Sequence, residues 1–416
     1  MTVDGRPGSL LRRVAVDVRP LRHTDFRRLF VGQGVSFVGY QLTAVAVPVQ
    51  MYAVTGSSYW VGLVGLAALV PLVVFGLYGG SISDAVDRRR LYVAASCLVW
   101  AVTGVLLVQA LLHLDNRWLL LALVAVQSVG FALSSPVRGA IVPRLLPLEL
   151  VPAGNTLNFT MSSVGMVAGP LLAGLVLANG SFATAYAIDA ALFTVGLYAA
   201  LRLPPLPPLG ATVRPGLRSV AAGLAFIATR PVLLLSFAID IVAMVLAMPR
   251  ALFPEVGETR FGGVGAVAWL FAAIAIGSVL GGLASGWIGR VRRQGLALVV
   301  AVLVWGVVVA LAGLADSLWL AVALLAVAGA ADLVSAVYRQ TILQTHAPDA
   351  MRGRMQGVFI VVVAGGPRLG DLRAGAMAAG YGVTVSWVGG GIACVLVVLV
   401  LAAAAPALVR YRRPEG

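Results

Sequence analysis

Long apolar runs dominate this chain, and short segments between them carry most of its charged residues. Many runs reach about 18 residues, which is the length that an α-helix needs to cross a bilayer. No two-residue alternation of the kind found in membrane β-barrels is present. The pattern therefore predicts an all-α membrane protein with twelve spans. We place the spans at roughly 29–53, 60–80, 91–112, 118–138, 155–178, 182–203, 231–253, 264–288, 295–314, 318–338, 355–379 and 383–409.

The composition supports a membrane location and argues against other classes of protein. The 416 residues are 60% hydrophobic and only 11% charged, and the mean hydropathy is +0.97. A soluble domain of this size needs far more polar surface. The net charge of +14 does not indicate a nucleic-acid-binding protein, because the arginines occupy short loops and form no basic face. We expect no enzyme activity, no cofactor and no metal site, and Cys97 and Cys394 lie inside apolar spans.

The distribution of arginine predicts how the chain crosses the membrane. All cationic side chains are arginine, and 25 of them fall in segments on the side of the N-terminus, including 88–90, 290–293 and 410–413. The opposite loops hold three: Arg117, Arg250 and Arg260. Cytoplasmic loops are enriched in positive charge. We therefore expect a multi-pass protein of the cell (inner) membrane with both termini in the cytoplasm, and no cleavable signal in its arginine-rich first 28 residues.

Breaks and matches along the chain predict two halves. The proline-rich segment 204–208 follows the sixth span, and a shift of 201 residues superimposes Arg138 on Arg339 and Pro147 on Pro348. Two sets of six spans related in this way are parallel repeats about an axis along the membrane normal. We divide the chain into segments 1–28 (cytoplasmic N-terminus), 29–203 (first half), 204–230 (central cytoplasmic linker), 231–409 (second half) and 410–416 (cytoplasmic tail). The stretch 217–229 has the pattern of a surface helix.

The loop between the second and third spans, residues 79–90, resembles the signature loop of the major facilitator superfamily. Ala85 and Asp87 depart from the family pattern, and a plain positive-inside loop is the simpler alternative. Gly80, Asp84, Arg88 and Arg89 carry the resemblance, and Arg90 follows them in the same loop. The resemblance implies the twelve-helix major facilitator fold and a loop that latches the two halves together. An acid in such a loop suits a helix N-terminus.

A glycine–proline motif in the fifth span resembles the antiporter motif of exporters in the same superfamily. Its residues are Gly165, Gly169, Pro170 and Gly174. Small residues four apart let helices approach closely, and proline bends a span. Generic close packing of membrane helices is the alternative interpretation of the same residues.

Three acids inside predicted spans are candidates for proton coupling: Asp240, Asp332 and Asp371. Ionisable groups are expensive in lipid, so each is a functional candidate. Asp371 lies three residues after Arg368 and can pair with it on one helix face. An acid without a cation can cycle protons, which favours Asp240, with Asp332 behind it. Structural pairing between helices remains the alternative for all three.

Arginine and glutamine residues in or near spans are candidates for substrate binding. Arg250, Arg368 and Arg373 are placed to attract an anionic substrate, although Arg250 is equally suited to pair with Glu255 or Glu258. Gln33 and Gln41 are uncharged and suited to line a cavity. Arg138 and Arg339 end spans on the predicted cytoplasmic side, and we interpret them as snorkelling anchors or interdomain latches.

The chain also resembles the bacterial enterobactin exporters. The segments 46–51 and 343–354, the pair Gly370-Asp371, and Arg250 before Phe253-Pro254 carry this resemblance. It implies proton-coupled export of a catecholate siderophore or similar amphiphile by alternating access, in a monomer with a small molecule, protons and lipid as its partners. Multidrug or macrolide efflux, import, and a non-transporting scaffold or sensor remain as rival functions.

Overall fold

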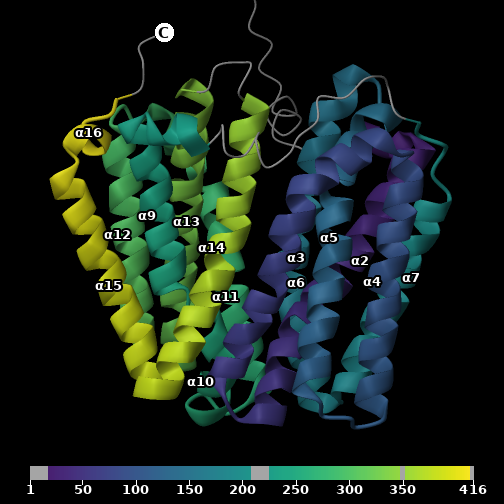
Figure 1. Cartoon of the computed structure of the whole chain (residues 1–416), viewed down its shortest axis with the longest axis horizontal. Helices are drawn as coiled ribbons and strands as arrows, with labels where there is room; N and C mark the ends of the chain where they lie inside the picture. The colour runs from purple at the N-terminus through teal and green to yellow at the C-terminus, as the bar shows by residue number, and fades with distance from the viewer. Residues whose placement is uncertain (1–16, 208–223, 347–351, 413–416) are drawn as a thin grey trace, which may run out of the picture.

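The computed structural model describes residues 17–207, 224–346 and 352–412. Twelve long helices in these residues form two bundles that stand side by side (Figure 1). The first bundle consists of α2 (Thr24–Thr55), α3 (Ser58–Ala85), α4 (Arg88–Leu111), α5 (Arg117–Leu145), α6 (Val151–Asn179) and α7 (Phe182–Leu201). The second consists of α9 (Pro231–Ala247), α11 (Val264–Leu283), α12 (Gln294–Gly313), α13 (Leu318–His346), α14 (Arg352–Tyr381) and α15 (Val383–Ala404).

Short helical turns connect or extend these helices. They are η1 (Arg19–Arg22), η2 (Leu148–Leu150), η3 (Arg250–Leu252), α10 (Phe253–Thr259), η4 (Ser285–Arg290) and α16 (Pro406–Val409). Eleven helical stretches of the described residues are long and apolar enough to cross a membrane. Helix α14 is not among them, and it carries Arg368, Asp371 and Arg373. It nevertheless packs against α3, α9 and α15 in the middle of the molecule.

Three predicted spans end earlier than the apolar pattern indicates. The predicted seventh span, 231–253, stops as a helix at Ala247 and continues as η3 and α10. Helices α11 and α15 likewise end at Leu283 and Ala404, and short turns complete the predicted lengths. Hydropathy alone does not detect these ends, because the residues beyond them stay apolar. Of the predicted surface helix at 217–229, the structure describes residues 224–229, and 224–228 are helical.

The two bundles touch at the end of the molecule opposite the C-terminus (Figure 1). Helix α3 crosses α14 there, and small residues keep the backbones close. A Cβ on Gly62 would lie 2.6 Å from the backbone oxygen of Asp371, and one on Gly375 would collide with the backbone oxygen of Ser58. The hydroxyl of Ser58 also donates a 2.5 Å hydrogen bond to Glu255. Helices from the two halves can come this close only because these side chains are small.

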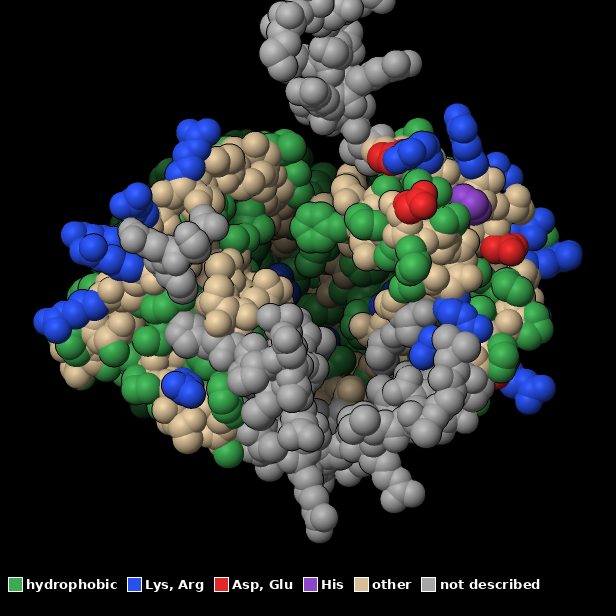
Figure 2. Space-filling model, turned by 90° about the horizontal axis from the view of Figure 1, so that it is seen from above, with side chains coloured by type: hydrophobic (Ala, Val, Ile, Leu, Met, Phe, Trp, Pro, Cys, Tyr) green, Lys and Arg blue, Asp and Glu red, His purple; other side chains and the backbone are tan. Residues whose placement is uncertain are grey.

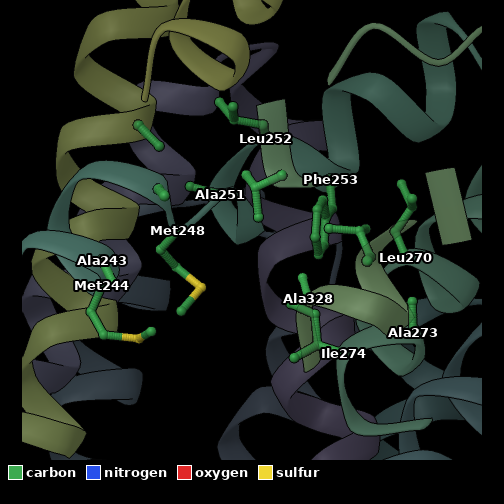
Figure 3. Packing of buried hydrophobic residues seen from close by; sticks show 14 of the residues in the cluster. Ala243, Met244, Met248, Ala251, Leu252, Phe253, Leu270, Ala273, Ile274 and Ala328 are labelled. Carbon is green, nitrogen blue, oxygen red and sulfur yellow. The ribbon is translucent and has the colours of Figure 1, made fainter. Parts of the chain in front are cut away.

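At the other end, the bundles are separated. Figure 2 shows a hollow between them on the face from which the C-terminus emerges. The arginine distribution predicts that this face is cytoplasmic. Below the hollow lies a core that combines side chains of both bundles. Part of it is visible in Figure 3, where Phe253, which follows the break after α9, lies near Leu270 of α11.

Candidate functional site

A cavity of about 360 Å³ lies between the two bundles. Helices α2, α3, α5 and α6 form one wall, and η3, α11 and α14 form the other. Five residues selected from the sequence line this cavity: Gln41, Pro170, Arg250, Arg368 and Asp371. Cavities near the middle of a two-bundle membrane protein are where secondary transporters bind their substrates. The cavity is therefore the candidate substrate site.

The second-half wall of the cavity is charged. Arg250, Arg368 and Asp371 line the cavity together, and the two arginines act electrostatically on the carboxylate of Asp371. Glycines hold this wall close to the first bundle, since a Cβ on Gly65 of α3 would lie 3.0 Å from the backbone oxygen of Arg368. Two cations and one anion leave this wall with excess positive charge.

A helix break brings Arg250 to the cavity. Met248, which precedes Pro249, has extended backbone angles (φ −79°, ψ 117°). Proline has no N–H, its ring clashes with the preceding turn, and it disfavours helical angles in the residue before it. Helix α9 therefore ends at Ala247, and η3 carries Arg250 to the lining of the cavity. Glu255, one of the two partners predicted for Arg250, accepts a hydrogen bond from Ser58.

Several buried polar atoms along the cavity have no hydrogen-bond partner in the described residues. They are Nε of Arg250, Nε of Arg368, Oδ1 of Asp371 and Nε2 of Gln127. Buried polar groups are nearly always hydrogen-bonded in proteins. A cluster of unsatisfied donors and one unsatisfied acceptor around one cavity indicates a surface that a polar ligand or water satisfies.

The first-half wall is aromatic. The ring of Tyr40 stacks on Phe131 with centroids 5.1 Å apart and planes inclined by 12°, and on Phe37 at 6.4 Å and 20°. All three rings line the cavity. Amides and hydroxyls of Gln41, Gln127 and Ser128 stand beside them. Flat aromatic surfaces bind other rings through offset stacking, so this wall suits an aromatic ligand.

Behind the charged wall, one arginine holds two acids. Arg339 of α13 is 5% exposed and forms an ion pair with Asp240 of α9, which is 2% exposed. Its other terminal nitrogen lies 3.8 Å from Asp332, whose side chain is 33% exposed. The interpretation of Arg339 as a snorkelling anchor is therefore wrong, because a snorkelling head group reaches water. Asp240 is also not the solitary acid that the sequence indicated.

Two further candidates lie away from the cavity. Arg373 donates hydrogen bonds to the backbone oxygens of Leu246 and Ser386, where it ties α14 to α9 and α15. Gln33 lies 3.4 Å from the hydroxyl of Tyr92, in hydrogen-bond contact. Tyr92 lines a second cavity of about 40 Å³ together with Arg138, whose guanidinium lies 5.4 Å from the centre of the Phe131 ring. The structure does not bring Arg373 or Gln33 together with Arg250 and Arg368.

The signature loop attaches the start of α4 to the linker. Asp87 accepts hydrogen bonds from the backbone of Arg89 and Arg90, so it caps α4, and its second oxygen accepts one from the backbone of Leu206. Asp and Asn are among the best N-caps, which explains why an acid fits at this departure from the family pattern. Arg89 donates to the backbone oxygen of Leu201. The surroundings of Gly80 and the side chain of Asp84 lie outside what the structure describes.

The glycine–proline motif of α6 has two packing partners. A Cβ on Gly165 or Gly169 would collide with Phe37 or Gln41 of α2, within the same bundle. One on Gly174 would collide with Ala268 of α11, in the other bundle. Pro170 lines the cavity between them. The motif thus lets α6 pack closely against both halves at once, and the packing interpretation accounts for its three glycines.

One buried acid, Asp189 of α7, is not among the residues predicted from the sequence. It is 1% exposed and accepts a 2.6 Å hydrogen bond from Thr43. The rule that selected Asp240, Asp332 and Asp371 applies equally to it, because it is the one acidic residue in the predicted span 182–203. A lone acid inside an apolar span is therefore a signal that identifies Asp189 from the sequence alone.

Comparisons with known proteins agree with this architecture. Residues 15–410 match the family model described as transmembrane secretion effector. The enterobactin exporter EntS of Shigella boydii serotype 18 is 31% identical over 368 residues, which is 86% of each chain, and EntS of Escherichia coli O139:H28 is 30% identical over the same share. The crystal structure of the nucleoside transporter NupG matches with a TM-score of 0.74 at 15% identity, over 93% of this chain and all of that one.

The likeness to NupG shows the fold alone, whereas the family match and the EntS relatives cover nearly the whole sequence. The two bundles, the cavity between them and the motifs of α3 and α6 belong to the same architecture. The chain is a member of the transmembrane secretion effector family of the major facilitator superfamily, a family of membrane transporters and not of enzymes.

Proposed function

We propose that this transporter exports an aromatic, acidic amphiphile, with a catecholate siderophore as the favoured class, in exchange for protons. The observation that carries the proposal is the asymmetry of the cavity. One wall presents Arg250 and Arg368 with unsatisfied Nε atoms, and the opposite wall presents stacked aromatic rings. The similarity to EntS supports the same class of substrate.

The two walls suit the two chemical features of such a molecule. Guanidinium groups bind oxyanions through charge-assisted hydrogen bonds, often two at once. Tyr40 and Phe131 offer a flat face against which a catechol ring can stack. Both features must be present to use the whole cavity. A neutral macrolide would use the aromatic wall and leave the arginines unsatisfied, which costs affinity.

The position of the cavity supports alternating access. The bundles are apart at the face of the termini and in contact at the opposite end, through α3 with α14 and α6 with α11. In the predicted orientation, this state loads substrate from the cytoplasm, as an exporter requires. Rocking of one bundle against the other would open the glycine-lined contact and expose the cavity on the other side.

Asp332 is the acid we assign to proton coupling. Asp240 is buried and paired with Arg339, so a proton reaches it only after that pair breaks. Asp332 is partly exposed, and its contact with Arg339 is long, at 3.8 Å. When Asp332 binds a proton, it becomes neutral and Arg339 pairs with Asp240 alone. When Asp332 releases the proton, Arg339 is shared between two ionised carboxylates. Such a change in local charge pairing can shift the equilibrium between the two conformations of a transporter.

Substrate class is tested with purified protein in liposomes that carry a pH gradient. The probes are an iron-free catecholate siderophore, its methylated catechol analogue without acidic hydroxyls, and a neutral macrolide. We expect gradient-driven transport of the catecholate and weak transport of the analogue. Equal transport of all three probes would favour multidrug efflux and contradict the proposal.

Coupling is tested with Asp332→Asn and Asp240→Asn in the same liposomes. We expect Asp332→Asn to keep exchange of labelled for unlabelled substrate and to lose gradient-driven efflux. Asp240→Asn should impair both activities through loss of the ion pair with Arg339. Unchanged gradient-driven efflux by Asp332→Asn would remove Asp332 from the coupling role.

A further inference from the structure

We propose that Asp189 is a proton-binding site of the first bundle, which exchanges its proton with the central cavity through Thr43 once in each transport cycle. The inference rests on the proton-coupled export proposed above and adds a site outside the charged second bundle. It starts from the contacts of one buried carboxylate on α7 with α2 and α4.

The surroundings of Asp189 contain hydroxyl groups and no cation. Oδ2 accepts from Thr43 of α2 at 2.6 Å and from Thr103 of α4 at 3.4 Å. The ionisable neighbour on its own helix is Tyr186, whose hydroxyl donates to Gln50. No charged side chain of the described residues acts on Asp189, and Arg138 of α5 borders the small cavity that reaches Phe193, one helical turn further along α7.

This environment favours a carboxyl group that carries a proton. An ionised carboxylate removed from water costs several kcal/mol unless a cation compensates for it. Oδ1 of Asp189 is buried and has no hydrogen-bond partner. It faces the backbone of Gly39 so closely that a Cβ there would collide with it. An oxygen left without a partner costs more on an ionised carboxylate than on a neutral carboxyl, so this site favours the protonated form.

Thr43 connects this carboxyl to the substrate cavity. It lines the cavity of 360 Å³ and at the same time donates its hydroxyl hydrogen to Asp189. A threonine hydroxyl is both a donor and an acceptor, and it rotates freely between partners. It can therefore pass its own hydrogen to Oδ2 of Asp189 while it takes a proton from water in the cavity, or run the same transfer in reverse. No net charge stays on the hydroxyl in either direction.

The packing of α2 on α7 links the proton to movement. A Cβ on Gly32 would collide with Ala199, and one on Gly196 would lie 2.7 Å from Oγ of Ser36. With Gly39 against Asp189, these contacts bring the two helices together along three turns. An ionised Asp189 needs water, and this packing leaves no room for it. Loss of the proton therefore favours a state in which α2 and α7 move apart, so proton binding is linked to the arrangement of the cavity-lining helix α2.

The test uses the full-length protein in lipid and three variants. Asp189→Asn mimics the protonated side chain in size and charge. Thr43→Val keeps the carboxyl and removes its hydrogen-bond donor. Thr160→Val is the matched control, because Thr160 is exposed on α6 and its hydroxyl donates to the backbone oxygen of Thr156 in its own helix.

Infrared difference spectra over a pH titration report directly on protonated carboxyl groups. We expect the wild-type protein to show a titrating carboxyl band that is lost in Asp189→Asn, shifted in frequency in Thr43→Val and unchanged in Thr160→Val. In liposomes, we expect Asp189→Asn to retain substrate exchange and to lose gradient-driven efflux. A carboxyl spectrum that Asp189→Asn leaves unchanged at every pH, or undiminished gradient-driven efflux in that variant, would overturn the inference.

Two features of the design keep the result decisive. If Asp189→Asn fails to insert or fold, the frequency shift in Thr43→Val against Thr160→Val decides whether the band belongs to Asp189. If the wild-type protein moves no probe in response to a pH gradient, the proposed export function fails. The infrared titration, which needs no substrate, still shows whether Asp189 binds a proton.

Discussion

Arg138 of the first bundle and Arg339 of the second are 201 residues apart in the sequence and end corresponding predicted spans, but their surroundings differ. Arg339 is buried and holds Asp240 and Asp332. Arg138 lies over the ring of Phe131 beside a small cavity, and the buried acid of its bundle, Asp189, has hydroxyl partners instead. The second bundle thus neutralises Arg339 with acids of its own, whereas the first keeps Arg138 and Asp189 apart.

This difference indicates different roles for the charged groups of the two halves. Paired charges stabilise a fold only while both partners remain, so the second bundle depends strongly on each member of its cluster. Separated charges leave each group available to a ligand or a proton. The walls of the cavity also differ, with arginines on the wall of the second bundle and aromatic rings on the wall of the first. Four substitutions test this division, from the largest expected effect to the smallest.

The largest effect is expected from Arg339→Gln. It leaves Asp240 buried without its cation, which costs about 3–5 kcal/mol of stability. Arg138→Gln is the matched change in the first bundle and should cost less than about 1 kcal/mol, the worth of a cation–π contact. The apparent unfolding midpoint in detergent measures both. The double variant Asp240→Asn/Arg339→Gln should recover part of the loss, and equal losses in the two single variants would contradict the division.

The contact between the halves should respond to Gly375→Ala. The new Cβ meets the backbone oxygen of Ser58, which cannot move aside as a flexible side chain would. Overpacking of this kind costs about 1–3 kcal/mol, which would shift the balance between the two transport states roughly 5- to 150-fold toward the state open at that end. Spin-label distances between the ends of α3 and α14 measure the shift. Gly380→Ala, on the same helix with open space around it, should leave the distances unchanged.

Substrate charge should be recognised by the second bundle. Arg250→Gln removes a charged donor at the cavity, and we expect about 1.5–2 kcal/mol of lost binding, roughly a 10- to 30-fold rise in Kd for a catecholate. Arg373→Gln, away from the cavity, should lower thermal stability and leave Kd within a factor of about 3. Isothermal titration calorimetry separates the two. A larger rise in Kd for Arg373→Gln would show that substrate charge is read elsewhere.

The smallest effect is expected on the aromatic wall of the first bundle. Phe131→Leu keeps an apolar side chain and removes the ring that stacks on Tyr40, so we expect a loss of about 0.5–1 kcal/mol, or roughly a two- to fivefold rise in Kd. The same change should scarcely affect a ligand without aromatic rings. Kd values for an aromatic and an aliphatic siderophore, measured on this variant, test that selectivity. Equal effects on the two would assign Phe131 to packing only.

Much of the fold was predictable from the sequence, because a bilayer imposes simple rules on it. Spans of about 20 apolar residues and the match of 79–90 to a known loop were enough to predict twelve helices and the superfamily. Single-residue candidates at the cavity, such as Gln41, Arg250 and Arg368, followed from the cost of polar groups in lipid. The same rule selects Asp189, which was overlooked.

Tertiary structure alone decided how these groups pair. Asp240 and Arg339 lie on different helices, and hydropathy says nothing of which helix faces are adjacent, so their ion pair and the burial of Arg339 were unpredictable. The end of α9 before Pro249 was equally unpredictable from the sequence, since α2, α3, α6 and α14 all continue through a proline. The sequence by itself determined where the chain meets lipid, which is a property of each segment. The packing of helices determined which charges neutralise one another and which remain free at the cavity, because that depends on distances between residues far apart in the chain.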